Sequence, residues 1–264
     1  MSGARDFTPQ TWAFLTDTLA LVSAQHSDVR AARVAELCEP ACCARMLDQL
    51  SPTIGSPGRR VTASLLSKRL GFLLTGAGLY ALSACNRVLD VSSDNCLIEW
   101  AHDGGRWTSS LPLVTLESIS LDGADREGLR TRLVTQLFAG VMQPLWQTFH
   151  EVSGVPLSML WENAAVRVYS LYERRMAKLD DPQARARRDE DFKFLLTAPP
   201  SLFGAPWNPL ARFYYPETPT EDGRTQRFRR TCCLYFKATC PAEYCQSCPL
   251  LKPRRRQSGT GSLI

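Results

Sequence analysis

The chain of 264 residues has few histidines and lacks the motifs of several common enzyme classes. No Gly-x-Gly-x-x-Gly loop follows a strand-like stretch, so a nucleotide or flavin fold is not indicated. No Gly-x-Ser-x-Gly elbow is present, which leaves a serine hydrolase without support. The three histidines, His26, His102 and His150, stand apart and form no metal-binding pattern, so surface or capping roles are expected for them. The chemistry has to come from other residues.

Long apolar runs are also missing, because no stretch reaches the roughly 18 residues that a membrane-spanning helix needs. The start, Met1-Ser2-Gly3-Ala4-Arg5-Asp6, lacks the layout of a signal peptide, which predicts a cytoplasmic protein. The net charge of +5 is modest, and much of it lies in basic runs at 185–188 and 254–256. Without interleaved aromatic residues, these runs do not indicate nucleic-acid binding.

Cysteine, in contrast, is plentiful, and five of the ten cysteines fall within the seventeen residues 232–248. In a reducing interior, metal ligation or free thiols are favoured over disulfides. Four thiolates brought together repel one another unless a cation lies between them. The cluster therefore predicts a site, and its members are Cys232, Cys233, Cys240, Cys245 and Cys248.

Spacing alone leaves three kinds of centre open: an iron-sulfur cluster, a structural zinc, or disulfides and a redox thiol pair. An ordinary zinc ribbon has two Cys-x-x-Cys knuckles, whereas here one half is the adjacent pair Cys232-Cys233. Adjacent side chains diverge along an extended backbone, and a two-iron cluster offers them a wider target than one zinc. Pro249 after the last cysteine is similar to the Cys-Pro ending of some ferredoxin motifs.

The chain resembles the ferric siderophore reductases of the FhuF type, which carry a C-terminal Cys-Cys-x10-Cys-x2-Cys signature. Residues 232–236, Cys-Cys-Leu-Tyr-Phe, and 244–249, Tyr-Cys-Gln-Ser-Cys-Pro, match its two ends. One departure is that eleven residues, not ten, separate Cys233 from Cys245, and this loop also holds Cys240. Weaker resemblances lie at 82–95, 160–165 and 208–210.

This resemblance implies a [2Fe-2S] cluster bound by Cys232, Cys233, Cys245 and Cys248. It also implies an oxidoreductase that transfers one electron to Fe(III) held by a siderophore of the hydroxamate type and so releases Fe(II). The expected partners are the ferric siderophore and an electron donor such as a ferredoxin or a flavin reductase, with no nucleic acid. We expect a monomer, and attachment to the inner membrane face stays open. Arg229, Arg230 and Lys237 flank the ligands, where they either favour the reduced cluster or only add solubility.

Two rival functions remain open. In the first, the cysteine module binds structural zinc and only fastens the C-terminus of a binding or assembly protein. In the second, the chain is related to siderophore biosynthesis, which the lack of a recognisable ATP-binding region weakens.

The predicted fold class is α+β, predominantly helical, with a small β-hairpin or sheet and a C-terminal cysteine-rich iron-sulfur module. Apolar residues repeat with helical spacing over most of the chain, which predicts a mainly helical structure. Asp103-Gly104-Gly105 predicts a turn between two strand-like stretches within 96–116. The predicted helices are 8–24, a short one after Asp28, one from Pro40 to before Ser51-Pro52, one from Val61 to Gly76 and Gly78, 126–150 with a kink at Pro144, 156–178, and 182–196.

Four regions are expected along the chain. Residues 1–198 form a helix-rich core that binds the siderophore, and 199–228 form a proline-rich connector that completes its cleft. The module at 229–253 holds the cluster, and 254–264 form a disordered tail. Outside the module, free packed thiols are expected for Cys38, Cys42, Cys43, Cys85 and Cys96, and turn or capping roles for Asp90, Asp94 and Asn95.

Overall fold

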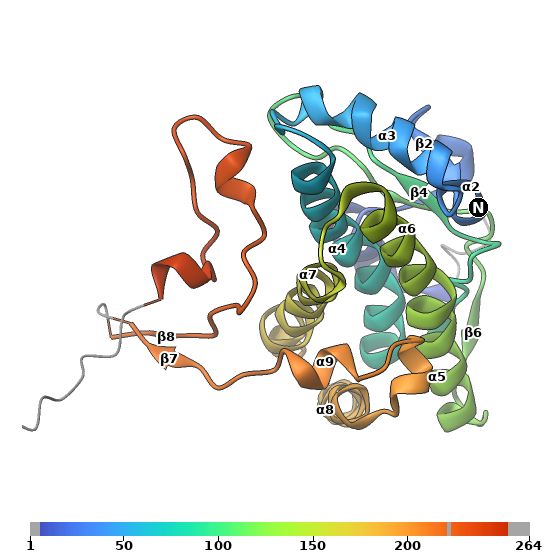
Figure 1. Cartoon of the computed structure of the whole chain (residues 1–264). Helices are drawn as coiled ribbons and strands as arrows, with labels where there is room; N and C mark the ends of the chain where they lie inside the picture. Colours follow the sequence, from blue (N-terminus) through green and yellow to red (C-terminus); the bar gives the residue numbers. More distant parts are fainter. Residues whose placement is uncertain (1–5, 221–222, 253–264) are drawn as a thin grey trace, which may run out of the picture.

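The computed structural model describes residues 6–220 and 223–252. Helices form most of the fold and short strands lie around them, so the predicted α+β class with a helix-rich core is confirmed (Figure 1). The predicted tail at 254–264 lies outside the described residues. Within the two described ranges, no helix combines the length and the apolar character that crossing a membrane requires.

The elements follow one another in the order that Figure 1 shows. The α-helices are α1 (Pro9–Ala13), α2 (Val34–Leu37), α3 (Pro40–Thr53), α4 (Arg59–Cys85), α5 (Arg126–Thr135), α6 (Gln143–Ser153), α7 (Leu157–Ser170), α8 (Pro182–Thr197) and α9 (Pro209–Arg212). The strands are β1 (Leu21–Ser23), β2 (Ala31–Arg33), β3 (Arg87–Leu89), β4 (Leu97–Glu99), β5 (Leu111–Leu113), β6 (Ser118–Ser120), β7 (Thr218–Pro219) and β8 (Thr225–Gln226). Segments of π-helix lie at Phe14–Thr18, Gln136–Met142 and Leu171–Arg175.

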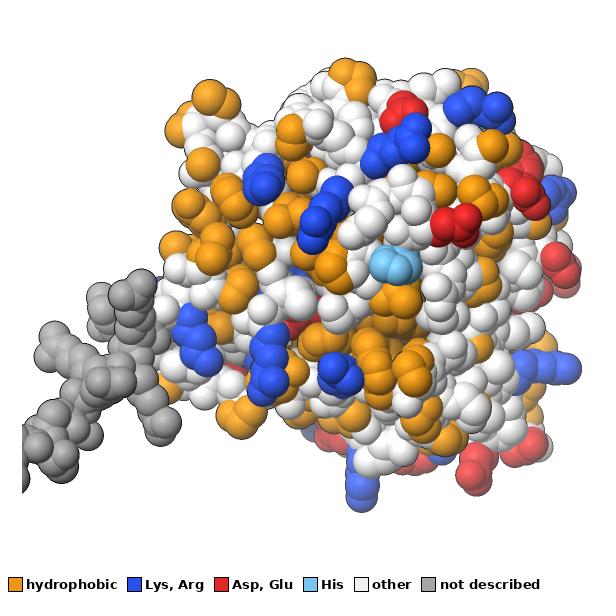
Figure 2. Space-filling model, viewed as in Figure 1, with side chains coloured by type: hydrophobic (Ala, Val, Ile, Leu, Met, Phe, Trp, Pro, Cys, Tyr) orange, Lys and Arg blue, Asp and Glu red, His pale blue; other side chains and the backbone are white. Residues whose placement is uncertain are grey.

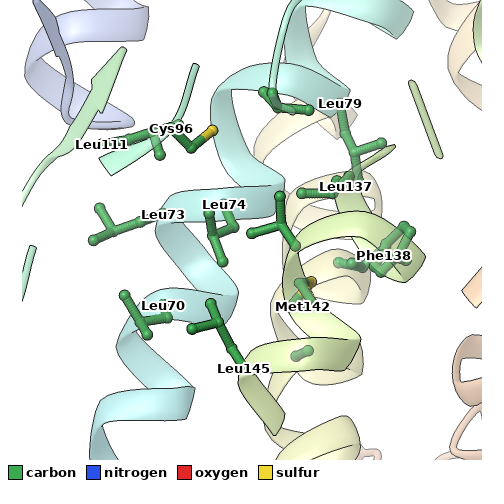
Figure 3. Packing of buried hydrophobic residues seen from close by; sticks show 14 of the residues in the cluster. Leu70, Leu73, Leu74, Leu79, Cys96, Leu111, Leu137, Phe138, Met142 and Leu145 are labelled. Atoms are coloured by element: carbon green, nitrogen blue, oxygen red, sulfur yellow. The ribbon is translucent and has the colours of Figure 1, made fainter. Parts of the chain in front are cut away.

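Helix α4 is the centre of the core, and α3, α6, α7 and α8 all pack against it. Figure 3 shows its leucines on two sides: Leu74 lies on the side of the 136–145 segment, whereas Leu73 points to the side of Leu111 and Cys96, and all belong to one apolar interior. Burial of this kind stabilises by roughly 25 cal/mol per Å² of apolar surface. Helix α7 comes so close that a Cβ on Gly71 would lie 2.9 Å from the Cα of Ala164. The glycine is therefore needed where these two helices cross.

The predicted end of α4 at Gly76 and Gly78 is wrong, because the helix continues to Cys85. A Cβ on Gly78 would lie 3.2 Å from Val91 Cγ1, so this glycine makes room for a neighbour and does not stop the helix. The helix ends at Asn86, which adopts the left-handed conformation with φ 53°.

The predicted helix over 8–24 is wrong beyond Thr18, where the π-helical segment ends. The chain then enters β1, which pairs in parallel with β5, and Leu111 N donates to Ala20 O at 2.7 Å. The helix expected after Asp28 begins only at Val34, because β2 comes first and pairs antiparallel with β4. Apolar spacing alone did not distinguish a helical stripe from a short buried strand with a distant partner.

Helix α3 passes the predicted stop at Ser51-Pro52 and ends at Thr53. The Ser51 hydroxyl donates to Leu47 O at 2.8 Å within this last turn. Pro52 lacks the N–H that would bond to Asp48 O, and the helix ends one residue later, at Thr53.

The predicted turn at Asp103-Gly104-Gly105 is confirmed, since Asp103 N donates to Arg106 O at 3.1 Å. The two arms form only isolated antiparallel bridges, Cys96 with Leu113 and His102 with Trp107, because β4 pairs with β2 and β5 pairs with β1. The Glu99 carboxylate lies between the arms and accepts from Ser110 N at 3.0 Å and from Ser110 Oγ at 2.9 Å. The buried Glu99 side chain therefore adds to the few backbone hydrogen bonds that join the arms.

The later helices agree with the prediction. Helical structure runs from Arg126 to Ser153, from Leu157 to Lys178 and from Pro182 to Thr197. Pro144 lies at the start of α6, directly after the π-helical segment at Gln136–Met142. A π-helical segment changes the backbone hydrogen-bond pattern locally. A helix can therefore accommodate a proline, which has no N–H, next to such a segment.

The proline-rich stretch begins as part of the core. Its Phe203 and Leu210 are fully buried, and Asn208 caps α9 while donating to Leu195 O and Ala198 O, both at 2.9 Å. After Phe213 the chain leaves the helices and forms β7 and β8, which pair antiparallel. The cysteine-rich segment follows and returns alongside α4 and α7 (Figure 1).

Candidate functional site

The four predicted ligands lie in an irregular segment, where tight turns set the backbone. Leu234 adopts the left-handed conformation with φ 63°, and its N–H donates to Cys232 Sγ at 3.4 Å. Cys248 N donates to Cys245 O at 2.9 Å, so the Cys-x-x-Cys stretch forms a turn that puts both thiols on one side. These turns let residues that are adjacent in sequence aim their sulfurs at different partners.

The thiols come together as two pairs. Cys233 Sγ lies 3.6 Å from Cys245 Sγ, and Cys232 is paired with Cys248 by electrostatics: burial raises the pKa of Cys232, and the Cys248 thiol adds to this effect. Each pair thus joins one member of the Cys-Cys doublet to one member of the Cys-x-x-Cys turn. Cys233 and Cys248 are buried, whereas the fifth cysteine of the segment, Cys240, is exposed.

Two cations act on the Cys233–Cys245 pair. Lys68 Nζ lies 3.9 Å from Cys233 Sγ, and the buried Arg229 lies close enough to act on both sulfurs. The hydrogen bond from the Cys245 thiol lowers the pKa of Cys233, and the charges of Lys68 and Arg229 add to this lowering. The same hydrogen bond, together with burial, raises the pKa of Cys245. The site therefore stabilises negative charge on the Cys233 sulfur, whereas burial also raises the pKa of Cys232.

Buried polar residues of α7 and α4 fasten the segment to the core. The Glu162 carboxylate accepts from Arg230 N at 2.8 Å, from Thr231 N at 2.7 Å and from the Thr231 hydroxyl. Arg229 Nε lies 3.7 Å from this carboxylate, and both side chains are 1% exposed. Arg229 also donates to Asn163 Oδ1 at 2.5 Å, so the cysteine doublet is anchored immediately before its first sulfur.

Further bonds hold the doublet from α4. The Ser64 hydroxyl donates to Cys233 O at 2.9 Å, and Asn163 Nδ2 donates to Ser64 O at 2.9 Å and to Ser67 Oγ at 2.8 Å. Ser64, Ser67 and Asn163 are fully buried. Buried polar groups are retained only with partners, so this network fixes the position of the sulfurs relative to the helices.

A cavity of about 430 Å³ lies between the helical core and the cysteine segment. The core contributes four cationic side chains, Lys68, Arg69, Arg167 and Arg175, and the segment contributes Tyr235, Ala238 and Thr239. Among the residues that the structure describes, none from the connector at 199–228 lines this cavity. Lys68 belongs both to the cavity and to the Cys233 site, which places the two side by side.

The flanking cations behave differently from one another. Arg229 is buried beside the sulfurs, whereas the Arg230 guanidinium stacks 3.7 Å over the Tyr215 ring and Lys237 is exposed. Lys68, from a helix distant in sequence, takes the position nearest to a sulfur. Of the three flanking cations, only Arg229 acts on the thiols of the Cys233–Cys245 pair.

The remaining candidates have the structural roles expected of them. Asp90 Oδ1 accepts from Ser92 N at 2.9 Å. The buried Asn95 donates to Asp90 O and Thr115 O, and these hydrogen bonds hold the stretch in a turn. His150 Nδ1 contacts Val155 O at 2.8 Å behind α6, and His26 is exposed. His102 differs from the expectation because it is buried and lines the cavity. The other cysteines are free and buried or half-buried: Cys38, Cys42, Cys43, Cys85 and Cys96.

A profile of the family described as "Ferric iron reductase FhuF-like transporter" matches residues 64–215, and the chain belongs to this family. The matched region begins in α4, includes the Glu162 and Asn163 anchors, and ends at Tyr215, before the first of the four cysteines. No curated protein matches the chain significantly.

Sequence reasoning found the cysteines but missed the residues that position them. Lys68, Glu162 and Asn163 are distant in sequence, and nothing in the local spacing of the motif points to them. One signal was present: Glu162-Asn163 interrupts an otherwise apolar face of a helix. Buried carboxylates and amides need partners, so this pair indicated a docking site for another part of the chain.

Proposed function

We propose that the protein is a ferric siderophore reductase that holds a [2Fe-2S] cluster on Cys232, Cys233, Cys245 and Cys248. In this proposal it transfers one electron at a time to Fe(III) in a hydroxamate siderophore, in the cytoplasm. The observation that carries the proposal is the arrangement of four thiols in two pairs, anchored to the core of a ferric iron reductase family member.

The donor set fits the cluster. Two thiolates bound about 2.3 Å from one tetrahedral metal lie about 3.8 Å apart, close to the 3.6 Å between Cys233 Sγ and Cys245 Sγ. A [2Fe-2S] cluster with four cysteine ligands requires two such pairs. A single structural zinc requires four ligands around one ion, whereas the sulfurs of Cys233 and Cys245 lie together as a pair. This arrangement favours two irons over the zinc alternative.

When bound, the cluster supplies one-electron redox chemistry. The chain's own residues set its surroundings. Lys68 and Arg229 place positive charge beside Cys233 and Cys245, which favours the more negative, reduced state. The burial of Cys233 and Cys248 limits access of water to one side of the site. The anchors Glu162 and Asn163 keep this environment fixed while charge changes.

The reaction needs one electron per iron from an external donor of the ferredoxin or flavin-reductase class, since the sequence has no nicotinamide or flavin motif. Fe(III) in the chelate accepts the electron and becomes Fe(II), and no covalent bond of the siderophore breaks. Hard oxygen donors hold Fe(II) less strongly than Fe(III), so the reduced iron leaves the chelate.

The test compares Cys245→Ser with Cys240→Ser, because both lie in the same segment and only Cys245 belongs to a pair. Protein prepared anaerobically is reduced with dithionite, freed of excess reductant and mixed with a ferric trihydroxamate, and Fe(II) is measured with a ferrous indicator. We expect Cys240→Ser to keep the visible spectrum and the stoichiometric release of Fe(II), and Cys245→Ser to lose both.

Two outcomes would contradict the proposal. Full Fe(II) release by Cys245→Ser would remove it from the ligand set. Loss of the spectrum in Cys240→Ser would show that the longer loop has shifted the set toward this exposed thiol.

A further inference from the structure

The cavity beside the cysteine segment carries an excess of positive charge. Lys68, Arg69, Arg167 and Arg175 line it, and no carboxylate does. The core also contributes His102 to the lining. Burial lowers the pKa of His102, so this imidazole is neutral at pH 7. The cavity therefore presents four formal positive charges to whatever enters it.

These cations lack the partners that buried charges normally have. Within the described residues, no salt bridge to a carboxylate involves Lys68, Arg69, Arg167 or Arg175. Arg69 instead donates to Ser109 Oγ at 3.0 Å and to Ser109 O, and Arg167 donates to Lys68 O at 3.2 Å. Lys68, Arg69 and Arg167 are half-buried, and half-buried cations without counter-ions are costly, so a binding partner with negative charge is indicated.

The pKa values of two of these cations, Arg69 and Arg167, are lowered. Burial lowers the pKa of Arg69 to about 10, and the charge of Arg167 adds to this effect. Burial lowers the pKa of Arg167 as well, with contributions from the charges of Arg229 and Arg175. An anion in the cavity would relieve this crowding, whereas a cationic ligand would increase it.

The sulfurs do not account for all of this charge. The charges of Lys68 and Arg229 lower the pKa values of the Cys233 and Cys245 thiols. The charges of these two thiols in turn oppose the lowering of the Arg167 pKa. Arg69 and Arg175 lie over the Phe72 ring, at 5.4 Å and 5.2 Å from its centroid. They are thus available to a molecule in the cavity.

We propose that this cavity binds the ferric chelate and selects chelates with net negative charge, such as hydroxamate siderophores that also carry free carboxylates. The inference rests on the proposed reductase function. The volume of about 430 Å³ is within the range of small-molecule sites, and the aromatic side chains of Phe72, Trp107 and Tyr235 give it apolar surface. On the face seen in Figure 2, Lys and Arg side chains predominate in the left and middle parts, and Asp and Glu side chains are more frequent toward the right and lower edges.

The position of the cavity fits electron transfer. Tyr235 lies two residues after Cys233, and Lys68 reaches from the cavity lining to the Cys233 sulfur. A chelate held here would be separated from the thiol by few atoms. A nicotinamide dinucleotide is the other small anion of comparable chemistry, but the cavity is lined by no glycine-rich phosphate loop at a helix N-terminus.

The experiment measures binding by calorimetry with gallium(III) complexes, because gallium(III) has the charge of Fe(III) and is not reduced. Three hydroxamate chelators vary the charge: a citrate-centred dihydroxamate with free carboxylates, a neutral cyclic trihydroxamate and a linear trihydroxamate with a free amine. We expect the anionic complex to bind at least tenfold more tightly than the cationic one, with an affinity that falls as salt rises.

Arg175→Gln and Arg174→Gln form the matched pair of variants. The two arginines are neighbours and both are exposed, but only Arg175 lines the cavity. Each substitution changes the net charge equally. We expect Arg175→Gln to weaken binding of the anionic complex about five- to tenfold and Arg174→Gln to leave it unchanged.

Equal affinity for all three complexes, or equal effects of the two variants, would overturn the charge selectivity. Binding of a nicotinamide dinucleotide in place of any gallium complex would reassign the cavity to the electron donor. If the wild type still releases Fe(II) from a neutral ferric trihydroxamate, the reductase function stands although this inference fails. Absence of Fe(II) release from every ferric chelate would instead contradict the proposed function.

Discussion

Lys68 connects the two parts of the site at the scale of single residues. Its ammonium group lies 3.9 Å from Cys233 Sγ and 5.6 Å from the centroid of the Tyr235 ring. One charge therefore stabilises thiolate sulfur and contributes to the cationic cavity at the same time. No sequence pattern predicts this, because Lys68 and Cys233 are brought together only by the packing of α4 against the C-terminal segment.

His102 gives the site a testable response to pH. Its Nδ1 accepts from Gly104 N at 3.0 Å, and this bond requires an unprotonated nitrogen. Burial lowers the pKa of His102, with Arg30 also lowering it and Asp103 opposing the shift. Because the folded-state pKa is below the unfolded value of about 6.5, the unfolded chain binds more protons as pH falls through this window.

We therefore expect the His102 contribution to the free energy of unfolding to be present above about pH 6.5 and to decrease as pH falls below it. Urea unfolding of the wild type and of His102→Gln at several pH values between 5 and 8 measures this contribution. The difference in stability between the two proteins should shrink toward acid. A difference that grows toward acid would mean that the folded protein prefers the charged imidazole.

At the scale of elements, α7 is both a core helix and the dock for the cysteine segment. Its apolar face packs against α4, whereas Glu162 and Asn163 turn their polar groups to Arg229, Arg230 and Thr231. The Glu162–Arg229 pair is almost fully buried. Removal of one partner from a buried pair leaves an uncompensated charge, which costs about 3–5 kcal/mol.

Glu162→Gln should therefore lower the free energy of unfolding by about 3 kcal/mol and reduce the iron content of the purified protein. Glu173→Gln is the control, because Glu173 also pairs with an arginine, Arg227, but is 30% exposed. This variant should lose less than about 1 kcal/mol and keep its iron. Urea unfolding and iron analysis measure both effects, and equal losses in the two variants would show that the buried anchor has no special role.

The elements also show why sequence patterns predicted some bounds and missed others. The helices over 126–153, 157–178 and 182–197 follow strong local signals, such as the Asp181 cap that accepts from Gln183 N and Ala184 N. The errors concern β1, β2 and the glycines of α4, where the outcome depends on a distant partner. Gly71 is needed because Ala164 of α7 packs directly against it, and local propensity does not predict such a contact.

At the scale of the whole molecule, the helical core and the cysteine segment supply different parts of the proposed reaction. The core carries the family match, the four cavity cations and the anchors, and the segment carries the thiols. The motif predicted the four thiols and the proposed cluster from sequence. The cavity could not be predicted, because its lining comes from α4, the 102–107 turn, α7 and the segment itself, which only the tertiary structure brings together.

The central claim is that the four paired cysteines hold a two-iron redox centre. Its most direct test is the iron and zinc content of anaerobically purified protein, combined with the EPR spectrum before and after reduction by dithionite. Our account predicts about two irons per chain, no stoichiometric zinc, and an S = 1/2 signal that appears only on reduction. One zinc per chain and no signal in either state would contradict it, and would make the cysteine segment a structural clamp.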